Sequence, residues 1–250
     1  MFKPSLGTQR HHQQCAAAGR SVFLRSFTNK GAPRLTSLLS TDVRTPRALK
    51  IIELENWAMD SWEPIQLLLS PVVATLRFIN CSFEFEVPEG RILMTPLPEQ
   101  LFALELENCF AEGQLIFERL PLTLRRVSIM SSGIEAVFTH GLPSSLKSFA
   151  LGNLYGDQSI DISAEMLPES LEEPTLVGCD QLESLPPRLR VLRMSEYGRQ
   201  LPTLPDTLEA LELDNRRHDV VQYPDRLRSL SLSWNPVMAP PWLPTSGPFF

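Results

Sequence analysis

Pairs of carboxylates separated by one residue are the arrangement in this sequence with the clearest capacity for chemistry. Two such groups about 5–9 Å apart across a cleft can act as acid and base on a glycosidic bond. Three pairs recur in similar local sequences: Glu53/Glu55, Glu105/Glu107 and Glu212/Asp214. Each pair occupies alternate positions of a predicted strand, on the side away from its apolar residues. We therefore interpret them as solvated charges on an open sheet face.

Histidine, cysteine and glycine are not spaced as metal or phosphate sites require. The four histidines, His11, His12, His140 and His218, are scattered, and neither H-E-x-x-H nor C-x-x-C occurs. The phosphate-binding loops G-x-x-x-x-G-K-[ST] and G-x-G-x-x-G are absent, as is the G-x-S-x-G nucleophile elbow. We predict no catalytic residue, no cofactor and no metal, and expect that the protein is not an enzyme.

The carboxylate pairs belong to a phrase, Leu-Pro-x-x-Leu-x-x-Leu-x-Leu, that recurs nine times. Its best copies are LPEQLFALELENC (97–109), LPDTLEALELDNR (204–216) and YPDRLRSLSLSWN (223–235). The anchor residues, three positions after Pro in most copies, are 18–28 residues apart: Leu49, Val73, Leu101, Leu124, Leu146, Leu171, Leu189, Leu208 and Leu227. Self-similarity at such a period indicates a solenoid of stacked units.

Each unit contains one predicted strand, because apolar residues at its fourth and sixth positions alternate with outward residues that are mostly polar. The apolar pairs are Ile52/Leu54, Leu76/Phe78, Leu104/Leu106, Val127/Ile129, Phe149/Leu151, Leu192/Met194, Leu211/Leu213 and Leu230/Leu232. Proline lacks an N–H, so the Pro of each repeat is expected in the loop that leads into the strand. No unit can bury its apolar face alone, but stacking the units makes a continuous core.

The repeat resembles the leucine-rich repeat family over roughly residues 45–235. Its form is similar to the short repeats of enterobacterial effector proteins, and LPSSLKSFALGN is also similar to FNIP-type repeats. The resemblance implies a repeat solenoid of α/β type but mostly β: a horseshoe with a curved parallel sheet of about nine short strands, extended or 3₁₀ outer segments and a concave binding face. Many such effectors have a catalytic domain after the repeats; because residues 236–250 are few and contain no Cys, we do not expect that activity here. Pro174, at a core strand position, predicts a local break, bulge or offset.

Charge and composition divide the chain into three expected segments. Residues 1–41 contain six basic residues and no acid, which leaves 17 basic and 29 acidic residues in 42–250, a net charge of −12. We expect a disordered basic extension over 1–41, the solenoid over 42–235 and a Pro-rich cap or tail over 236–250. An acidic body argues against nucleic acid as a partner, and no apolar run is long enough for a membrane span.

The basic extension and the cysteines bear on localisation. The extension fits an ordinary basic tail, a mispredicted start, a mitochondrial transit peptide or an unusual secretion signal. Cys81, Cys109 and Cys179 share the ninth position of their repeats, where we expect small, buried, inward side chains. The repeat position accounts for these cysteines without any disulfide bond, and we therefore favour a reducing compartment. We predict a cytoplasmic protein, with a mitochondrial one as the alternative.

The outward positions of the strands are the candidate binding surface. Their side chains are charged in the first and last thirds and small or weakly apolar in the middle, where we expect a shallow groove. The predicted partner-binding residues are Glu53, Arg77, Glu105, Glu107, Met130, Arg193, Glu212 and Trp234. Trp234 fits an aromatic anchor or an end cap equally, and Met130 is also explained as incidental surface. Asparagines at the eighth position are interpreted as turn residues rather than ligands.

These observations favour a non-catalytic module that recognises a protein partner on the concave face. The alternative is a structural or assembly scaffold bound through its outer loops or tails. The sequence names neither the partner nor the oligomeric state.

Overall fold

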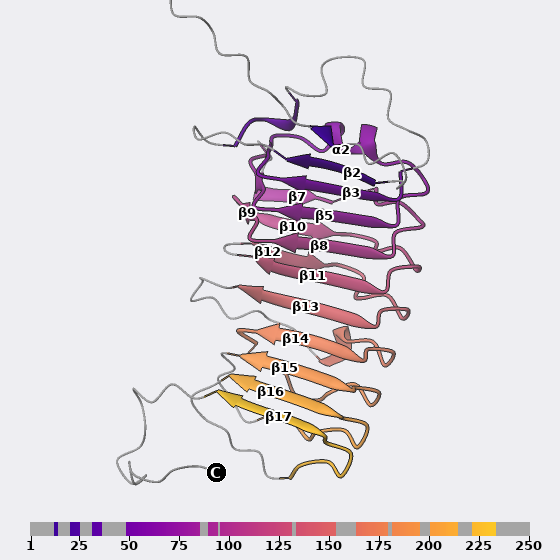
Figure 1. The fold of residues 1–250 in the computed structure, drawn as a ribbon, viewed down its shortest axis with the longest axis vertical. Coiled ribbons are helices and arrows are strands. Elements are labelled where there is room, and N and C mark those ends of the chain that lie inside the picture. The colour runs from indigo at the N-terminus through magenta and orange to yellow at the C-terminus, as the bar shows by residue number, and fades with distance from the viewer. Residues whose placement is uncertain are drawn as a thin grey trace, which may run out of the picture.

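The main feature of the fold is an eleven-stranded sheet whose strands follow chain order (Figure 1). The computed structural model describes residues 13–14, 21–25, 32–36, 49–85, 90–94, 96–131, 134–153, 164–179, 182–195, 201–214 and 222–233. The strands are β1 (Gln13–Gln14), β2 (Ser21–Arg25), β3 (Ile51–Glu55), β5 (Thr75–Ile79), β8 (Ala103–Glu107), β11 (Arg126–Ser131), β13 (Ser148–Asn153), β14 (Glu173–Val177), β15 (Val191–Ser195), β16 (Ala210–Asp214) and β17 (Ser229–Ser233). Neighbours from β2 to β17 are parallel. The chain is therefore a parallel β-solenoid with very little helix.

The Pro-x-x-Leu part of the repeat forms the turn that enters each strand. The N–H of Leu101 donates to the carbonyl of Pro98 at 3.0 Å, and Leu146 donates to Pro143 in the same way at 3.0 Å. Equivalent bonds recur at Leu124, Leu171, Leu189, Leu208 and Leu227. Proline suits this position because it fixes φ and has no N–H to leave unpaired. The turn places the anchor leucine in the core.

Alternate side chains of the strands build the core. The inward residues of β3 to β16 are buried; Ile52, Leu76 and Leu104, for example, have no exposed surface. The last strand differs, because Leu230 and Leu232 keep 46% and 44% of their surface exposed. Within the described residues, β17 is the end of the stack, with no further coil against it.

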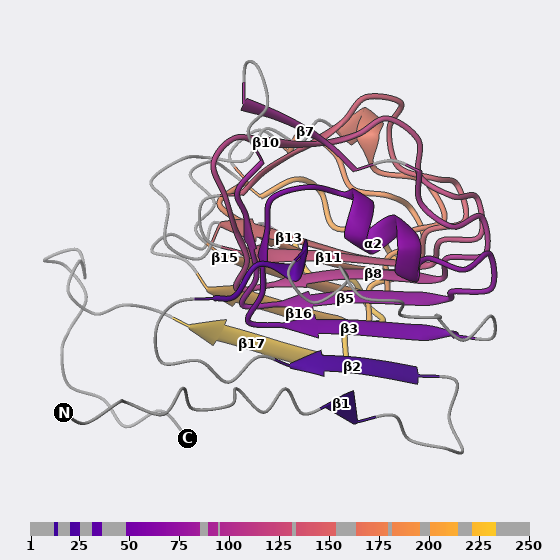
Figure 2. The ribbon, with the colours of Figure 1, turned by 90° about the horizontal axis from the view of Figure 1, so that it is seen from above.

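The longer N-terminal coils contain further strands that the compact C-terminal coils lack. One small parallel sheet consists of β4 (Ala58–Met59), β6 (Ser82–Phe83) and β9 (Phe110–Ala111). Another consists of β7 (Arg91–Leu93), β10 (Gln114–Phe117) and β12 (Glu135–Phe138), and Figure 2 shows β7 and β10 across the core from the large sheet. Helix α2 (Glu63–Leu68) and the 3₁₀ turn η2 (Ala164–Met166) lie in the connections. No helix in the described part of the chain has the length and hydrophobicity needed to cross a bilayer.

The sheet holds more strands than the nine expected, because it extends at its N-terminal edge. β2 pairs in parallel with all five residues of β3, and β1 adds an antiparallel strand beyond it. Leu24 of β2 is buried. The sheet thus begins N-terminal to residue 42, where the solenoid was expected to start.

Pro174 shortens one ladder without breaking the stack. β14 keeps full register with β13, from Ser148 opposite Glu173 to Gly152 opposite Val177. Its ladder to β15 covers only Thr175–Val177. A residue without an N–H cannot donate to a ladder, and the pairing with β15 begins at the residue that follows it.

Asparagine or glycine in a left-handed conformation forms the corner after several strands. Asn56, Asn80 and Asn108 have φ of 61°, 50° and 50°, and Gly178 has φ of 75°. The N–H of Asn80 donates to the Glu107 carbonyl of the next coil at 2.9 Å, and the N–H of Gly178 donates to Ser195 at 3.0 Å. Asparagine tolerates this backbone region better than other non-glycine residues, which supports their interpretation as turn residues.

Three cysteines are free thiols in the core. Cys81, Cys109 and Cys179 expose 2%, 0% and 2% of their surface. Cys81 Sγ donates to the Leu54 carbonyl at 3.3 Å, and Cys109 Sγ donates to the Phe78 carbonyl at 3.4 Å. The hydrogen bond with Cys81, together with burial, raises the pKa of the Cys109 thiol.

These thiols are expected not to react with a thiol reagent while the protein is folded. Burial keeps the reagent away from all three sulfur atoms. At Cys109 the raised pKa also suppresses the thiolate, which is the reactive form. In a Cys15→Ser background, 5,5′-dithiobis(2-nitrobenzoate) should label none of the three residues before denaturant is added and all three afterwards. Rapid labelling of Cys109 without denaturant would contradict the prediction.

Candidate functional site

The open face of the solenoid is the side of the large sheet that points away from the core. We define it by the fifth and seventh positions of each repeat, which lie on adjacent strands at the same register. Within the described residues, no second layer covers this face, which makes it the broadest regular surface on which a partner can lie. Its three parts have different chemistry.

An ion-pair network occupies the N-terminal third of the open face. Arg77 of β5 lies 3.4 Å from Glu53 Oε2 on β3, and 3.2 and 2.8 Å from the Oε2 atoms of Glu105 and Glu107 on β8. Arg25 pairs with Glu55, and Arg126 lies 3.7 Å from Glu105. Partial burial lowers the pKa of Arg77, but the hydrogen bond with Glu107 and the nearby carboxylates outweigh it. The pKa of Arg77 is therefore raised above its ordinary value. Four predicted binding residues therefore already bind one another.

Removing the central cation of this network is expected to destabilise the fold. Arg77→Ala would leave Glu53, Glu105 and Glu107 close together without their shared counter-charge, and we expect a loss of about 1–2 kcal/mol in the free energy of unfolding at low salt. The loss should shrink as ionic strength rises from about 0.01 M to about 1 M, because salt screens exposed charges. Urea denaturation at both salt concentrations measures it.

The matched control is Arg193→Ala, which removes one exposed ion pair on the same face. It should cost less than about 1 kcal/mol. Equal losses for the two variants would show that the Arg77 network contributes no more than a single pair.

The middle third of the open face is filled rather than hollow. Gly152 of β13 is buried, although it lacks a side chain. A Cβ built on it would lie 2.8 Å from Val177 Cβ and 3.1 Å from Met130 Cε. The two neighbouring side chains therefore meet over the glycine, and the expected shallow groove is absent at this point. Met130 lies on the open face at the edge of this contact.

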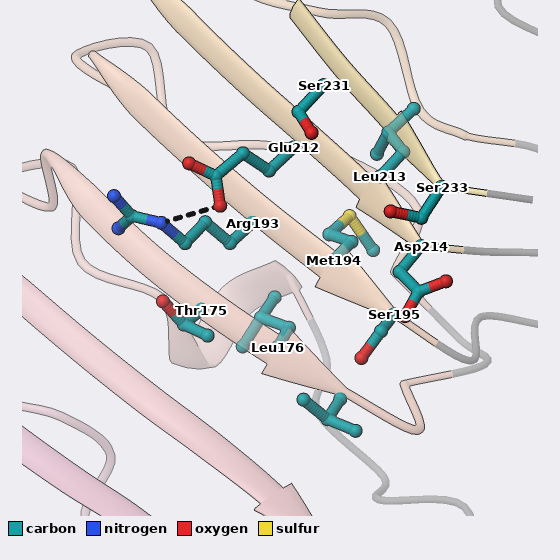
Figure 3. Close-up of a pocket in the computed structure, with 11 residues that line it drawn as sticks. Thr175, Leu176, Arg193, Met194, Ser195, Glu212, Leu213, Asp214, Ser231 and Ser233 are labelled. Carbon is teal, nitrogen blue, oxygen red and sulfur yellow. Dashed lines mark hydrogen bonds and ion pairs between the residues drawn. The ribbon is translucent and has the colours of Figure 1, made fainter.

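A hollow of about 220 Å³ lies in the C-terminal third, across β14 to β17 (Figure 3). On one side, Arg193 Nε donates to Glu212 Oε2 at 3.0 Å. On the other side, Ser195, Asp214 and Ser233 are register partners on three successive strands. The hollow exists because the side chains in this part of the face are short. Its remaining lining residues are Thr175, Leu176, Val177, Met194, Leu213 and Ser231.

The structure separates the predicted binding residues into groups. Glu53, Arg77, Glu105 and Glu107 form the N-terminal network, Met130 lies in the middle, and Arg193 and Glu212 line the hollow. Trp234 lies outside the described residues. The sequence analysis noted Asp214 only as part of a carboxylate pair and did not select Ser195. Their seventh-position placement was the available signal, since it puts them on the open face beside Glu212.

Comparisons with known proteins give no assignment. Within the described residues, no three of His, Cys, Asp and Glu come together as metal ligands would. No protein-family model matches the chain, and a comparison with curated proteins finds no relative.

Proposed function

We propose that the protein is a non-catalytic protein-binding module of the leucine-rich repeat type, and that a partner binds the C-terminal third of its open face. The Leu-Pro-x-x-Leu-x-x-Leu-x-Leu repeat and the parallel solenoid support the family assignment. The hollow across β14 to β17 is the observation that carries the choice of region. It is a concave surface on a hydrogen-bonded sheet, where a partner side chain can bind without rearranging the protein.

The choice of the C-terminal third also follows from the ion pairs already formed among the charged side chains of the N-terminal third. Ion pairs between strands already join Arg77 to Glu53, Glu105 and Glu107. A partner would have to break these ion pairs before it could bind the four side chains. We therefore assign these four residues to joining neighbouring coils. Arg193 and Glu212 also pair with each other, but they line the hollow and so remain in the proposed interface as its wall. Trp234, adjacent to Ser233 in sequence, remains a predicted contact. An ordinary interface buries about 800 Å² per partner, so it would extend beyond the hollow.

Affinity purification with quantitative mass spectrometry tests the proposal. A variant with Ser195→Arg and Ser231→Arg fills the hollow with two long side chains. The matched control, Ser144→Arg and Ser184→Arg, adds the same charge at exposed loop positions. Circular dichroism and urea denaturation would first show that both variants fold as the wild type does.

The proposal expects a partner that the wild type and the loop variant recover and the hollow variant does not. A partner lost only in the loop variant would favour the alternative, a scaffold bound through its outer loops. Equal recovery by all three proteins would contradict recognition at the hollow.

A further inference from the structure

Asp214 differs from the other carboxylates in the fifth and seventh columns of the open face. Five of the six have an arginine partner: Glu53, Glu105 and Glu107 contact Arg77, Glu55 contacts Arg25, and Glu212 contacts Arg193. Within the described residues, no ion pair forms at Asp214. Among the described residues, its carboxylate is therefore the one in these columns without a counter-ion, and it lies at the hollow.

The side chains around Asp214 suit a hydrogen-bond donor that enters from solvent. Ser195 of β15 and Ser233 of β17 stand at its register on either side, and adjacent strands are about 4.8 Å apart. Figure 3 shows the three side chains together at the carboxyl ends of their strands. A carboxylate and two hydroxyls can accept several hydrogen bonds from one group.

The charge of the hollow selects a cation. Arg193 is already bound to Glu212, so with Asp214 the lining has a net charge of −1. An anion would meet two carboxylates and an occupied guanidinium. A cation would meet the uncompensated carboxylate, and the net charge of −12 over residues 42–250 would attract a basic partner.

We propose that the hollow binds a lysine or arginine side chain of the protein partner, with the Asp214 carboxylate as its counter-ion and Ser195 and Ser233 as flanking acceptors. The proposal rests on the proposed function, since it names the chemistry that the same face recognises. The volume of about 220 Å³ is below the range of about 300–1,000 Å³ typical of small-molecule sites, and fits one side chain. The partner residue would lie across β15 to β17.

Short peptides test the proposal without knowledge of the partner. The probes are acetyl-Gly-Arg-Gly-amide, acetyl-Gly-Lys-Gly-amide and, as the neutral isostere, acetyl-Gly-citrulline-Gly-amide, titrated into the full-length ¹⁵N-labelled protein. We expect saturable amide shifts at Ser195 and Asp214 with the two cationic peptides and none with the citrulline peptide. Asp214→Asn, which removes the charge and keeps the shape, should weaken binding at least about tenfold.

The matched control is Asp206→Asn, an exposed carboxylate in the turn before β16, which should leave affinity unchanged. The proposal is overturned if the citrulline peptide binds as the arginine peptide does, if Asp214→Asn binds as wild type does, or if no saturable shift occurs. Recovery of the natural partner separates this inference from the proposed function. If the Ser195→Arg and Ser231→Arg variant loses the partner but Asp214→Asn still recovers it, the proposed binding face is supported and the cation site is contradicted.

Discussion

Gly113→Ala is expected to lower the free energy of unfolding by about 3 kcal/mol or more. Gly113 and Gly90 immediately precede β10 and β7, which pair in parallel. A Cβ on Gly113 would lie 2.0 Å from the Gly90 carbonyl oxygen and 2.7 Å from its carbonyl carbon. The contact is with backbone, so no side chain can rotate away, and φ of 133° is itself strained for alanine. The two coils would have to separate, and urea denaturation measures the loss.

Gly141→Ala separates the two causes. Gly141 also has a positive φ, of 73°, but a Cβ there would meet nothing within 4 Å. Its substitution should cost only the conformational penalty of about 1–2 kcal/mol. Similar denaturation midpoints for the two variants would mean that the close approach of Gly113 to Gly90 does not limit stability.

Phe78→Ala is expected to cost about 4 kcal/mol, the second large effect. Phe78 of β5 has no exposed surface. Its ring lies 6.1 Å from that of Trp62 and 5.5 Å, edge to face, from that of Phe83. The substitution removes these contacts and leaves a cavity that the stacked backbone cannot close. The loss should appear in urea denaturation and as faster amide exchange in β3, β5 and β8.

Phe102→Ala is the matched control, because it removes the same atoms from a ring that is 52% exposed in the turn before β8. It should change stability by no more than about 0.5 kcal/mol. A comparable loss for the two variants would contradict the placement of Phe78 at the centre of the core.

The repeat predicts the large sheet well because the residues that form each turn and strand are close together in the sequence. Pro98 and Leu101 are three residues apart and close their own turn, and alternation within five residues decides which side chains enter the core. The small sheets were not predicted. Strands such as β6 and β9 have two residues each and form only because stacking places their coils side by side. β2 was missed because no Leu-Pro-x-x-Leu turn precedes it.

The candidate site was predicted only as a surface. The repeat positions predict that Glu212 and Asp214 point outward. They do not predict which of the two forms an ion pair. That depends on a side chain in another coil: Arg193 precedes Glu212 by 19 residues and reaches it, whereas no arginine stands at the same register as Asp214. The filled middle of the face likewise depends on how Met130 and Val177 meet over Gly152.

The two kinds of coil give the molecule unequal mechanical strength along its length. A coil that contains β10 is held by ladders in two sheets, whereas the described strands β16 and β17 belong to the large sheet alone. A force applied between the chain ends is therefore expected to detach the strands held by the large sheet alone. These are β1 and β2 at one end and β17, then β16 and β15, at the other, in successive small extensions. The coils from β3 to β11 would resist to a higher force. Under tension the proposed binding face would be dismantled while the coils from β3 to β11 stayed folded.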